Sequence, residues 1–152
     1  ELESVVICPL HHYPEKFWNE QTVMSIIKSA ISSNRIDVHQ INIMGVSRGG
    51  YAAWRLAIEH PDFWSSCVVA GGASAPFVYA FRIPTLPVWA FHGAKDEIVP
   101  ISVTENMVKQ LKSLGSHVKF TVVPEGGHDS ICWDEAFLDP SVYEWILQQR
   151  RS

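Results

Sequence analysis

A chain of 152 residues is long enough for one compact domain with its own core but hardly for two, so we expect a single domain over residues 1–152. Hydrophobic residues make up 47% of the chain and charged residues 18%, which excludes a disordered chain and favours a globular one. The formal net charge of −4 argues against nucleic acid or an anionic membrane as the main partner, and no apolar run is long enough to span a bilayer.

Short apolar runs alternate with stretches of helical period along most of the chain. In chain order we expect a strand at Ser4–Leu10, a helix at about Glu15–Ser32, a strand at Ile41–Val46, a helix at Tyr51–His60, a strand at Ser66–Ala70, a loop or small cap at 73–87, a strand at Val88–His92, a helix at Pro100–Leu114, a strand at Val118–Val123 and a helix at about Ser141–Arg150. Strands that alternate with helices imply βαβ units. The predicted fold class is therefore α/β, with a mainly parallel sheet flanked by helices.

Polar residues gather where the predicted strands end. The positions that follow the strands are His11, Ser47, Gly71, the segment 93–96 and the segment 124–128. In open α/β sheets, ligands bind at the carboxyl ends of the strands. The predicted site therefore contains a serine, an aspartate and a histidine, the residue types of nucleophilic catalysis.

The segment Gly45-Val46-Ser47-Arg48-Gly49 matches the pattern G-x-S-x-G and stands between a predicted strand and a predicted helix. In this motif the serine occupies a sharp turn, and side chains two residues either way would collide with the adjoining strand and helix. We expect Ser47 to be the nucleophile and the backbone N–H of Arg48 to face a developing oxyanion. The alternative is that Ser47 is a turn residue in a glycine-rich bend. The Arg48 side chain is a separate matter, and we expect it to be a solvated surface charge.

A serine hydroxyl needs a general base, because it is almost wholly protonated at neutral pH. The expected base is His128, which follows two glycines after the fifth predicted strand. The expected acid is Asp96, with Glu97 as the runner-up, and its role is to hold one imidazole tautomer and to stabilise the imidazolium. Alternatively, Asp96 caps the helix that begins near Pro100 or belongs to a turn. Trp133 lies close to the base in the sequence, and we expect it to line the acyl site.

Other aromatic residues could line a pocket or fill the core: Trp64, for which we favour the core, Phe77, Tyr79 and Phe81. His92 stands at a strand end and is expected to be structural. Cys8 and Cys67 lie in apolar runs and are expected to be buried. No catalytic role is expected for Cys132, since no basic residue is placed to activate it.

The segments GVSRGGYAAW, HPDFW and FHGAKDEIVP together resemble the α/β-hydrolase superfamily. More narrowly, they resemble the esterase and polyhydroxybutyrate-depolymerase-like branch of prolyl-oligopeptidase relatives. The residues that match that branch are Ser47, Gly50, Tyr51, Pro61, Asp62, Phe63, His92, Gly93, Asp96, Val99 and Pro100. The resemblance implies an α/β-hydrolase fold and a triad in the chain order serine, aspartate, histidine. Chemistry of this kind requires no metal and no organic cofactor.

Members of that family carry further strands before the region of Ser4–Leu10, and a loop among those strands supplies a second oxyanion N–H. We therefore expect either that the chain is the C-terminal part of a longer domain, or that His11-His12-Tyr13 or a partner subunit supplies this donor. His11 and His12 are also candidates for substrate binding. The sheet edge that absent strands would leave open predicts self-association as a homo-oligomer.

The leading prediction is hydrolysis of small-molecule carboxylic esters through an acyl-enzyme. One alternative is a peptidase or thioesterase with the same triad, and another is a non-catalytic, hydrolase-like binding or scaffold domain. The complete set of three residues argues against the last, because a binding domain has no physical need for all three. The chain opens at Glu1 without a signal-peptide pattern, so this end gives no information on the compartment.

Overall fold

The computed structural model describes residues 4–10, 18–73 and 76–151. The chain divides into two compact units, Glu1–Val38 and His39–Ser152. The expectation of a single domain stays a prediction. The candidate substrate-binding residues His11 and His12 lie outside the described residues.

In the first unit, the described residues form one helix, α1 (Glu20–Ser33). The side-chain oxygen of Asn19 caps this helix by accepting a hydrogen bond from the Thr22 N–H at 3.0 Å. Glu20 adds a negative charge to the first turn, where the helix dipole favours one. The helix predicted at about Glu15–Ser32 is confirmed in its described part.

The predicted strand at Ser4–Leu10 is wrong. These residues form no strand, and Val6 and Leu10 are 78% and 95% exposed. Cys8 is exposed as well, although we expected it to be buried. A β-branched run has the propensity for a strand, but it forms one only where its backbone groups find a neighbouring strand.

The second unit is a parallel sheet with helices packed on it. Its elements are β1 (Asn42–Val46), α2 (Arg48–Glu59), β2 (Ser66–Ala70), the 3-10 helix η1 (Phe77–Arg82), β3 (Val88–Gly93), α3 (Ser102–Ser113), β4 (Lys119–Val123), α4 (Ser130–Phe137) and α5 (Pro140–Gln148). The strands lie in the order β1-β2-β3-β4, and every neighbouring pair is parallel. The prediction of an α/β fold with a mainly parallel sheet is confirmed. Self-association through a sheet edge stays a prediction.

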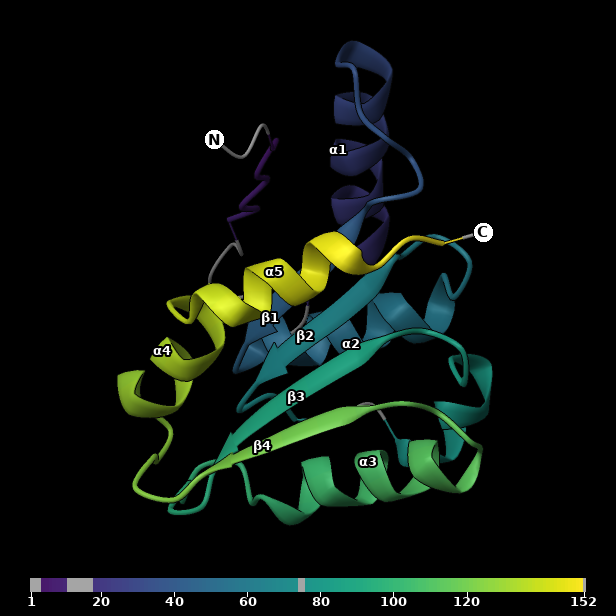
Figure 1. Ribbon diagram of the computed structural model, residues 1–152. Coiled ribbons are helices and arrows are strands. Elements are labelled where there is room, and N and C mark those ends of the chain that lie inside the picture. The colour runs from purple at the N-terminus through teal and green to yellow at the C-terminus, as the bar shows by residue number, and fades with distance from the viewer. Residues whose placement is uncertain (1–3, 11–17, 74–75, 152) are drawn as a thin grey trace. The chain divides into compact units, whose positions relative to one another are not determined.

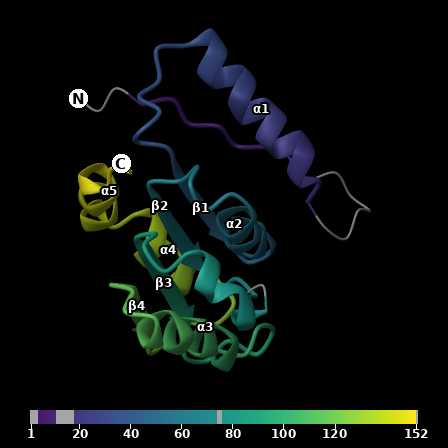
Figure 2. The same cartoon turned by 90° about the vertical axis from the view of Figure 1, so that its right-hand side faces the viewer.

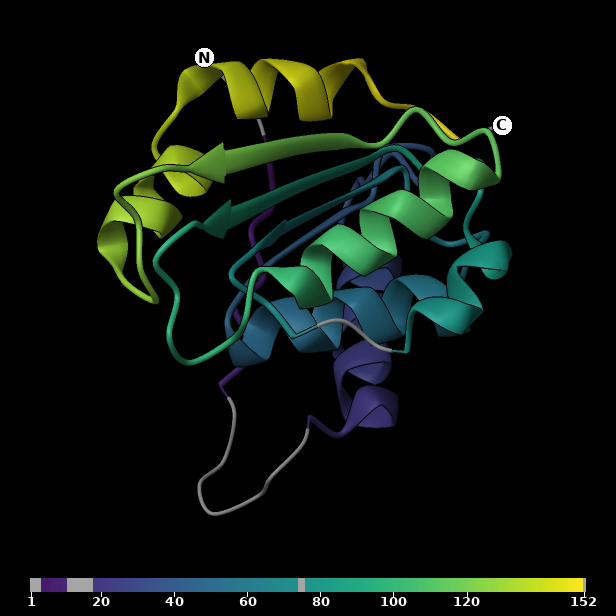
Figure 3. The same ribbon diagram turned by 90° about the horizontal axis from the view of Figure 1, so that it is seen from below.

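Helices cover both faces of this sheet. Helices α2 and α3 lie on one face and α4 and α5 on the other (Figures 2 and 3). Alternate strand residues face the two helix layers. The hydrophobic cluster between the sheet and helices α4 and α5 consists of Val68, Ala70, Phe91, Ala136, Val142 and Ile146. Because all pairs are parallel, the carboxyl ends of the four strands meet at one edge of the sheet (Figure 1).

Two helices differ from the sequence prediction. The 3-10 helix η1 forms within the segment 73–87, where we expected a loop or cap, and it packs against α3 and α2. Helix α4 forms where the sequence predicts no helix. Its eight residues are too few to show a clear helical period. Trp64 is 3% exposed and donates its indole N–H to the Leu56 carbonyl at 3.0 Å, which confirms its core role. In the described part of the chain, no helix is long and apolar enough to cross a membrane.

Candidate active site

Ser47 occupies the sharp turn between β1 and α2. With φ 51° and ψ −116°, it is the only non-glycine residue of positive φ in the described part of the chain. Its N–H donates to the Ala70 carbonyl at 3.0 Å, and its own carbonyl accepts from the Tyr51 N–H at 3.0 Å. Such a conformation costs about 1–3 kcal/mol and persists only where the surrounding structure imposes it. The strand and the helix therefore hold Ser47 in a strained turn at the carboxyl edge of the sheet.

Close backbone approaches explain two of the glycines around Ser47. A Cβ at Gly45 would lie 2.2 Å from the Gly49 carbonyl oxygen, and a Cβ at Gly50 would lie 2.9 Å from the Gly72 Cα. Gly49 differs, because a Cβ there meets nothing within 4 Å. The expected collision on both sides of the motif is therefore correct for Gly45 and wrong for Gly49. The second crowded position is Gly50.

His128 lies in the loop between β4 and α4, and the end of β3 holds that loop in place. The Lys95 N–H donates to the Gly126 carbonyl at 2.9 Å. A Cβ at Gly93 would lie 2.3 Å from the same carbonyl oxygen. The two loops thus approach each other so closely that only a glycine fits at position 93.

Asp129 fixes the C-terminal end of the loop that carries His128, and it was not among the residues predicted from the sequence. Its carboxylate is the N-cap of α4 and lies 3.1 Å from the Ile131 N and 3.4 Å from the Cys132 N. It also accepts from the Gly127 N–H at 3.3 Å. Aspartate is a preferred N-cap residue, so this signal was present in the sequence. The N-cap preference of Asp129 could not be used, because no helix was predicted at α4.

Asp96 presents its two carboxylate oxygens to different partners. Oδ1 accepts from the backbone N–H groups of Ile98 at 2.9 Å and Val99 at 2.7 Å. Asp96 therefore also stabilises a turn, which was one of the alternative roles predicted for it. Oδ2 faces His128, and the whole side chain is buried. Burial raises the pKa of Asp96, but the hydrogen bonds from Val99, His128 and Ile98 outweigh it, so this pKa lies below its ordinary value. The carboxylate is therefore ionised at neutral pH.

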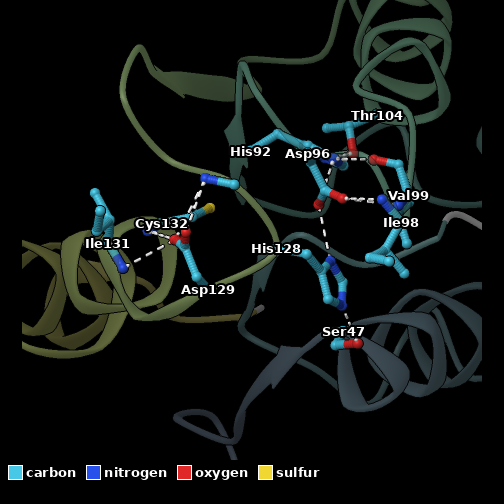
Figure 4. Close-up of polar contacts among 11 residues, drawn as sticks. Ser47, His92, Asp96, Ile98, Val99, Thr104, His128, Asp129, Ile131 and Cys132 are labelled. Carbon is cyan, nitrogen blue, oxygen red and sulfur yellow. Dashed lines mark hydrogen bonds and ion pairs between the residues drawn. The ribbon is translucent and has the colours of Figure 1, made fainter.

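Ser47, His128 and Asp96 form one line of hydrogen bonds (Figure 4). Ser47 Oγ lies 2.7 Å from His128 Nε2, and His128 Nδ1 lies 2.8 Å from Asp96 Oδ2. An ionised carboxylate can only accept, so His128 Nδ1 carries a proton, and Nε2 of the neutral ring accepts from the serine hydroxyl. The His128 side chain is 15% exposed and that of Asp96 is 0% exposed. This geometry allows a general base to take the proton of a serine nucleophile.

Arg48, the expected oxyanion donor, is the first residue of α2, and its side chain is exposed. The first N–H groups of a helix have no acceptor within that helix. The Arg48 N–H therefore has no acceptor in α2, and its role toward an oxyanion stays a prediction.

Trp133 of α4 lies directly against the base. Its ring is nearly perpendicular to the His128 imidazole, at 88°, with the two ring centroids 5.7 Å apart. Its indole N–H is buried without a hydrogen-bond partner, and Nε1 would lie 3.5 Å from a Cβ at Gly71. Whether Trp133 lines an acyl site stays a prediction. The other aromatic candidates, Phe77, Tyr79 and Phe81, lie on η1, beside α3 and toward the end of the sheet at which the strands begin (Figure 3).

Cys132 also lies near the base, but its chemistry is that of a buried thiol. Burial raises its pKa to about 11, so the thiol is protonated at neutral pH. Cys67 is buried as expected. Among the described residues, no group of three or more His, Cys, Asp or Glu side chains is arranged to hold a metal ion.

Comparison with known proteins assigns the family. A model of phospholipases and carboxylesterases matches residues 18–139, which include Ser47, Asp96 and His128. The chain belongs to the phospholipase/carboxylesterase family. A curated protein named as an esterase, NocK of Nocardia uniformis subsp. tsuyamanensis, is 30% identical to it over 77 residues. That match covers 50% of this chain and 22% of NocK.

Solved structures resemble this phospholipase/carboxylesterase chain over most of its length. A thermostable esterase has a TM-score of 0.82 at 28% identity, over 91% of this chain and 38% of the esterase. SOBER1 of Arabidopsis thaliana has a TM-score of 0.69 at 19% identity, over 85% of this chain and 63% of SOBER1. An acylaminoacyl peptidase of Pyrococcus horikoshii has a TM-score of 0.72 at 16% identity, over 88% of this chain and 28% of the peptidase. The last two matches show the fold alone.

The family match, the thermostable esterase and NocK confirm an α/β-hydrolase fold and an esterase-type family of hydrolases. The narrower resemblance to polyhydroxybutyrate-depolymerase-like esterases stays a prediction. The chain spans 22% of the length of NocK and 38% of that of the thermostable esterase. The activity and the substrates of the whole protein are therefore matters of proposal.

Proposed function

We propose that this chain hydrolyses carboxylic esters of small molecules through an acyl-enzyme on Ser47. The observation that carries the proposal is the line of hydrogen bonds from Ser47 through His128 to Asp96, at 2.7 Å and 2.8 Å. The family supports esters as the substrate class. The strained serine turn and the buried acid also support catalysis, because a binding domain needs neither.

In the first half of the reaction, Ser47 Oγ attacks the carbonyl carbon of the ester while His128 Nε2 takes the hydroxyl proton. Asp96 accepts the Nδ1–H bond and stabilises the imidazolium without taking its proton. The backbone N–H of Arg48 donates to the oxyanion of the tetrahedral intermediate. His128 then gives its proton to the alkoxide, which leaves as the alcohol, and the acyl group stays on Ser47.

In the second half, water replaces the alcohol. His128 takes a proton from the water as its oxygen attacks the acyl-enzyme, and the carboxylic acid leaves when Ser47 Oγ regains that proton. The chain's own side chains and water supply every proton in this cycle, so the proposal includes no metal and no organic cofactor. Trp133, which contacts the base, is our candidate for the acyl side of the pocket.

The direct test is hydrolysis of p-nitrophenyl acetate and p-nitrophenyl butyrate by the purified chain. We expect turnover that is lost in Ser47→Ala and unchanged in Ser113→Ala, a matched change at an exposed serine of α3. A well-folded chain without turnover on either ester would contradict the proposal. The corresponding p-nitroanilides test the peptidase alternative, because an amide is much harder to cleave than an activated ester, so ready turnover of the anilides would favour a peptidase.

Covalent labelling tests the nucleophile without a choice of ester. A fluorophosphonate probe should modify Ser47, and the modification should be lost in His128→Ala, because the hydroxyl then lacks its base. Labelling is read by peptide mass spectrometry. Modification at a different serine alone would overturn the assignment of Ser47. An unlabelled but folded chain would support the non-catalytic binding domain instead.

A further inference from the structure

His92 is a second imidazole at the carboxylate of Asp96. It lies at the end of β3, and its side chain is completely buried. Its Nε2 lies 2.8 Å from the Val99 carbonyl oxygen and 3.3 Å from Asp96 Oδ2, while its Nδ1 lies 2.8 Å from Thr104 Oγ1 (Figure 4). Each ring nitrogen therefore has a defined partner.

These partners determine where the His92 proton lies. A carbonyl oxygen and an ionised carboxylate both accept and cannot donate, so Nε2 must carry a proton. The hydroxyl of Thr104, which is itself buried in the first turn of α3, can donate to the unprotonated Nδ1. The neutral Nε2–H tautomer thus satisfies every contact that the His92 ring makes.

The consequence for Asp96 is that four N–H groups surround one carboxylate. Oδ1 receives the backbone N–H groups of Ile98 and Val99, and Oδ2 faces both His128 Nδ1 and His92 Nε2. Because the His92 ring also binds the Val99 carbonyl, it holds the turn whose N–H groups bind Oδ1. One side chain therefore fixes both the orientation of the carboxylate and the position of its loop.

We propose that His92 is a positioning residue for the triad. It holds Asp96 Oδ2 against His128 Nδ1, and through that bond it keeps the base in the tautomer that can accept the Ser47 proton. This inference rests on the proposed function, since it assigns His92 a part in the same site. His92 does not touch the reacting atoms, and a misplacement of about 1 Å at a catalytic group can cost on the order of a hundredfold in rate.

Two substitutions separate the roles of the two ring nitrogens. In His92→Gln, the side-chain amide can take the place of Nε2–H and donate to Val99 and Asp96. In His92→Asn, the shorter amide reaches only the place of Nδ1, next to Thr104. Each variant loses the hydrogen bonds of one ring nitrogen. The two variants should therefore be destabilised to a similar extent, and each controls for a general loss of stability in the other. Ser66→Ala, which removes a buried hydroxyl at the start of β2, controls for loss of a polar contact away from the site.

We expect kcat on p-nitrophenyl esters to fall roughly 30-fold or more in His92→Asn and to stay within about threefold of the parent in His92→Gln. KM should stay unchanged in both variants, since His92 lies behind Asp96 and not against the substrate. The Ser66→Ala control should keep the parental kcat. An equal fall in the two His92 variants, or no fall in either, would overturn the proposal.

A spectroscopic test separates this inference from the proposed function. With 15N-labelled histidine, NMR should show His92 as a neutral ring with its proton on Nε2, and the downfield His128 Nδ1–H signal should persist in His92→Gln but not in His92→Asn. These signals do not need turnover. An inactive chain that shows them would contradict the proposed function and still support the positioning role of His92. A His92 proton on Nδ1 instead of Nε2 would overturn the inference even if His92→Asn does not fold.

Discussion

His92 and His128 each direct a ring nitrogen at the same atom, Oδ2 of Asp96, from 3.3 Å and 2.8 Å. The other oxygen of that carboxylate receives two backbone N–H groups. Asp96 is therefore held as an acceptor on every side. A buried carboxylate in this setting is stable only as the anion, which is the form that an imidazolium partner requires.

Substitution Asp96→Asn should lower kcat by a factor on the order of a thousand to ten thousand. The backbone N–H groups of Ile98 and Val99 hold the amide oxygen at the Oδ1 position, so the NH2 group takes the place of Oδ2 and faces His128. His128 Nδ1 must then accept, and its proton moves to Nε2, which can no longer accept from Ser47. Steady-state ester hydrolysis measures the effect.

The control for this prediction is Glu97→Gln, because Glu97 is the runner-up acid in the sequence. Glu97 is exposed, so we expect its substitution to leave kcat unchanged. A large loss of activity in Glu97→Gln together with an active Asp96→Asn would reverse the assignment of the acid.

The depressed pKa of Asp96 predicts a loss of stability in acid. A folded-state pKa below the unfolded value stabilises the fold at pH values above the unfolded pKa, which is about 3.9 for aspartate. That contribution falls as the pH drops through the folded-state pKa. Urea unfolding at pH 5 and below should therefore show the free-energy advantage of the parent over Asp96→Asn shrinking as the pH falls. An advantage that stays constant down to pH 2 would contradict this prediction.

Much of the fold could be predicted from local patterns. β2 spans the expected Ser66–Ala70 and β3 the expected Val88–His92 with one more residue, because apolar runs bounded by turn residues mark buried parallel strands. The strand at Ser4–Leu10 could not be judged in this way. A strand depends on a partner elsewhere in space, and a sequence window does not show whether one exists.

The same distinction between local and long-range information applies to the site. Ser47, Asp96 and His128 each follow a strand, and parallel strands end at a common edge, so their proximity follows from topology. The positioning role of His92 could not be predicted from the sequence, because its tautomer depends on Thr104. Helix α3 brings Thr104 to the ring from twelve residues further along the chain. The freedom at Gly49 was hidden for a similar reason, since its surroundings depend on how α2 leaves the turn.

The strained backbone of Ser47 predicts an order of stability between two inactive variants. Glycine adopts positive φ without the Cβ clash, whereas alanine keeps it. Ser47→Gly should therefore be more stable than Ser47→Ala by about 1 kcal/mol, although glycine gains more freedom in the unfolded chain. Urea denaturation of both proteins measures the difference. If Ser47→Ala were the more stable variant, the turn would not be strained in solution.

The perpendicular contact between Trp133 and His128 predicts different outcomes for two substitutions. Trp133→Phe keeps an aromatic ring against the imidazole and removes an indole N–H that has no partner, so kcat should stay within about threefold. Trp133→Ala removes the ring, and kcat should fall roughly tenfold or more, because the base is no longer held in place. If Trp133 also lines the acyl side, the ratio of kcat/KM for butyrate over acetate changes in Trp133→Ala. A lower kcat at an unchanged ratio would leave Trp133 a support for His128 alone.

The glycines of the serine motif differ in the room around them, and one pair of substitutions can show it. A Cβ at Gly45 would lie 2.2 Å from a backbone oxygen that cannot move without displacing α2, so Gly45→Ala should cost about 1–3 kcal/mol or more and should lower fluorophosphonate labelling of Ser47. A Cβ at Gly49 meets open space in the first turn of α2, and alanine loses less conformational freedom on folding than glycine, by about 0.4–1 kcal/mol. Gly49→Ala should therefore label at the parental rate and unfold at an equal or higher urea concentration. Equal damage from the two substitutions would mean that the motif needs both glycines for a reason other than space.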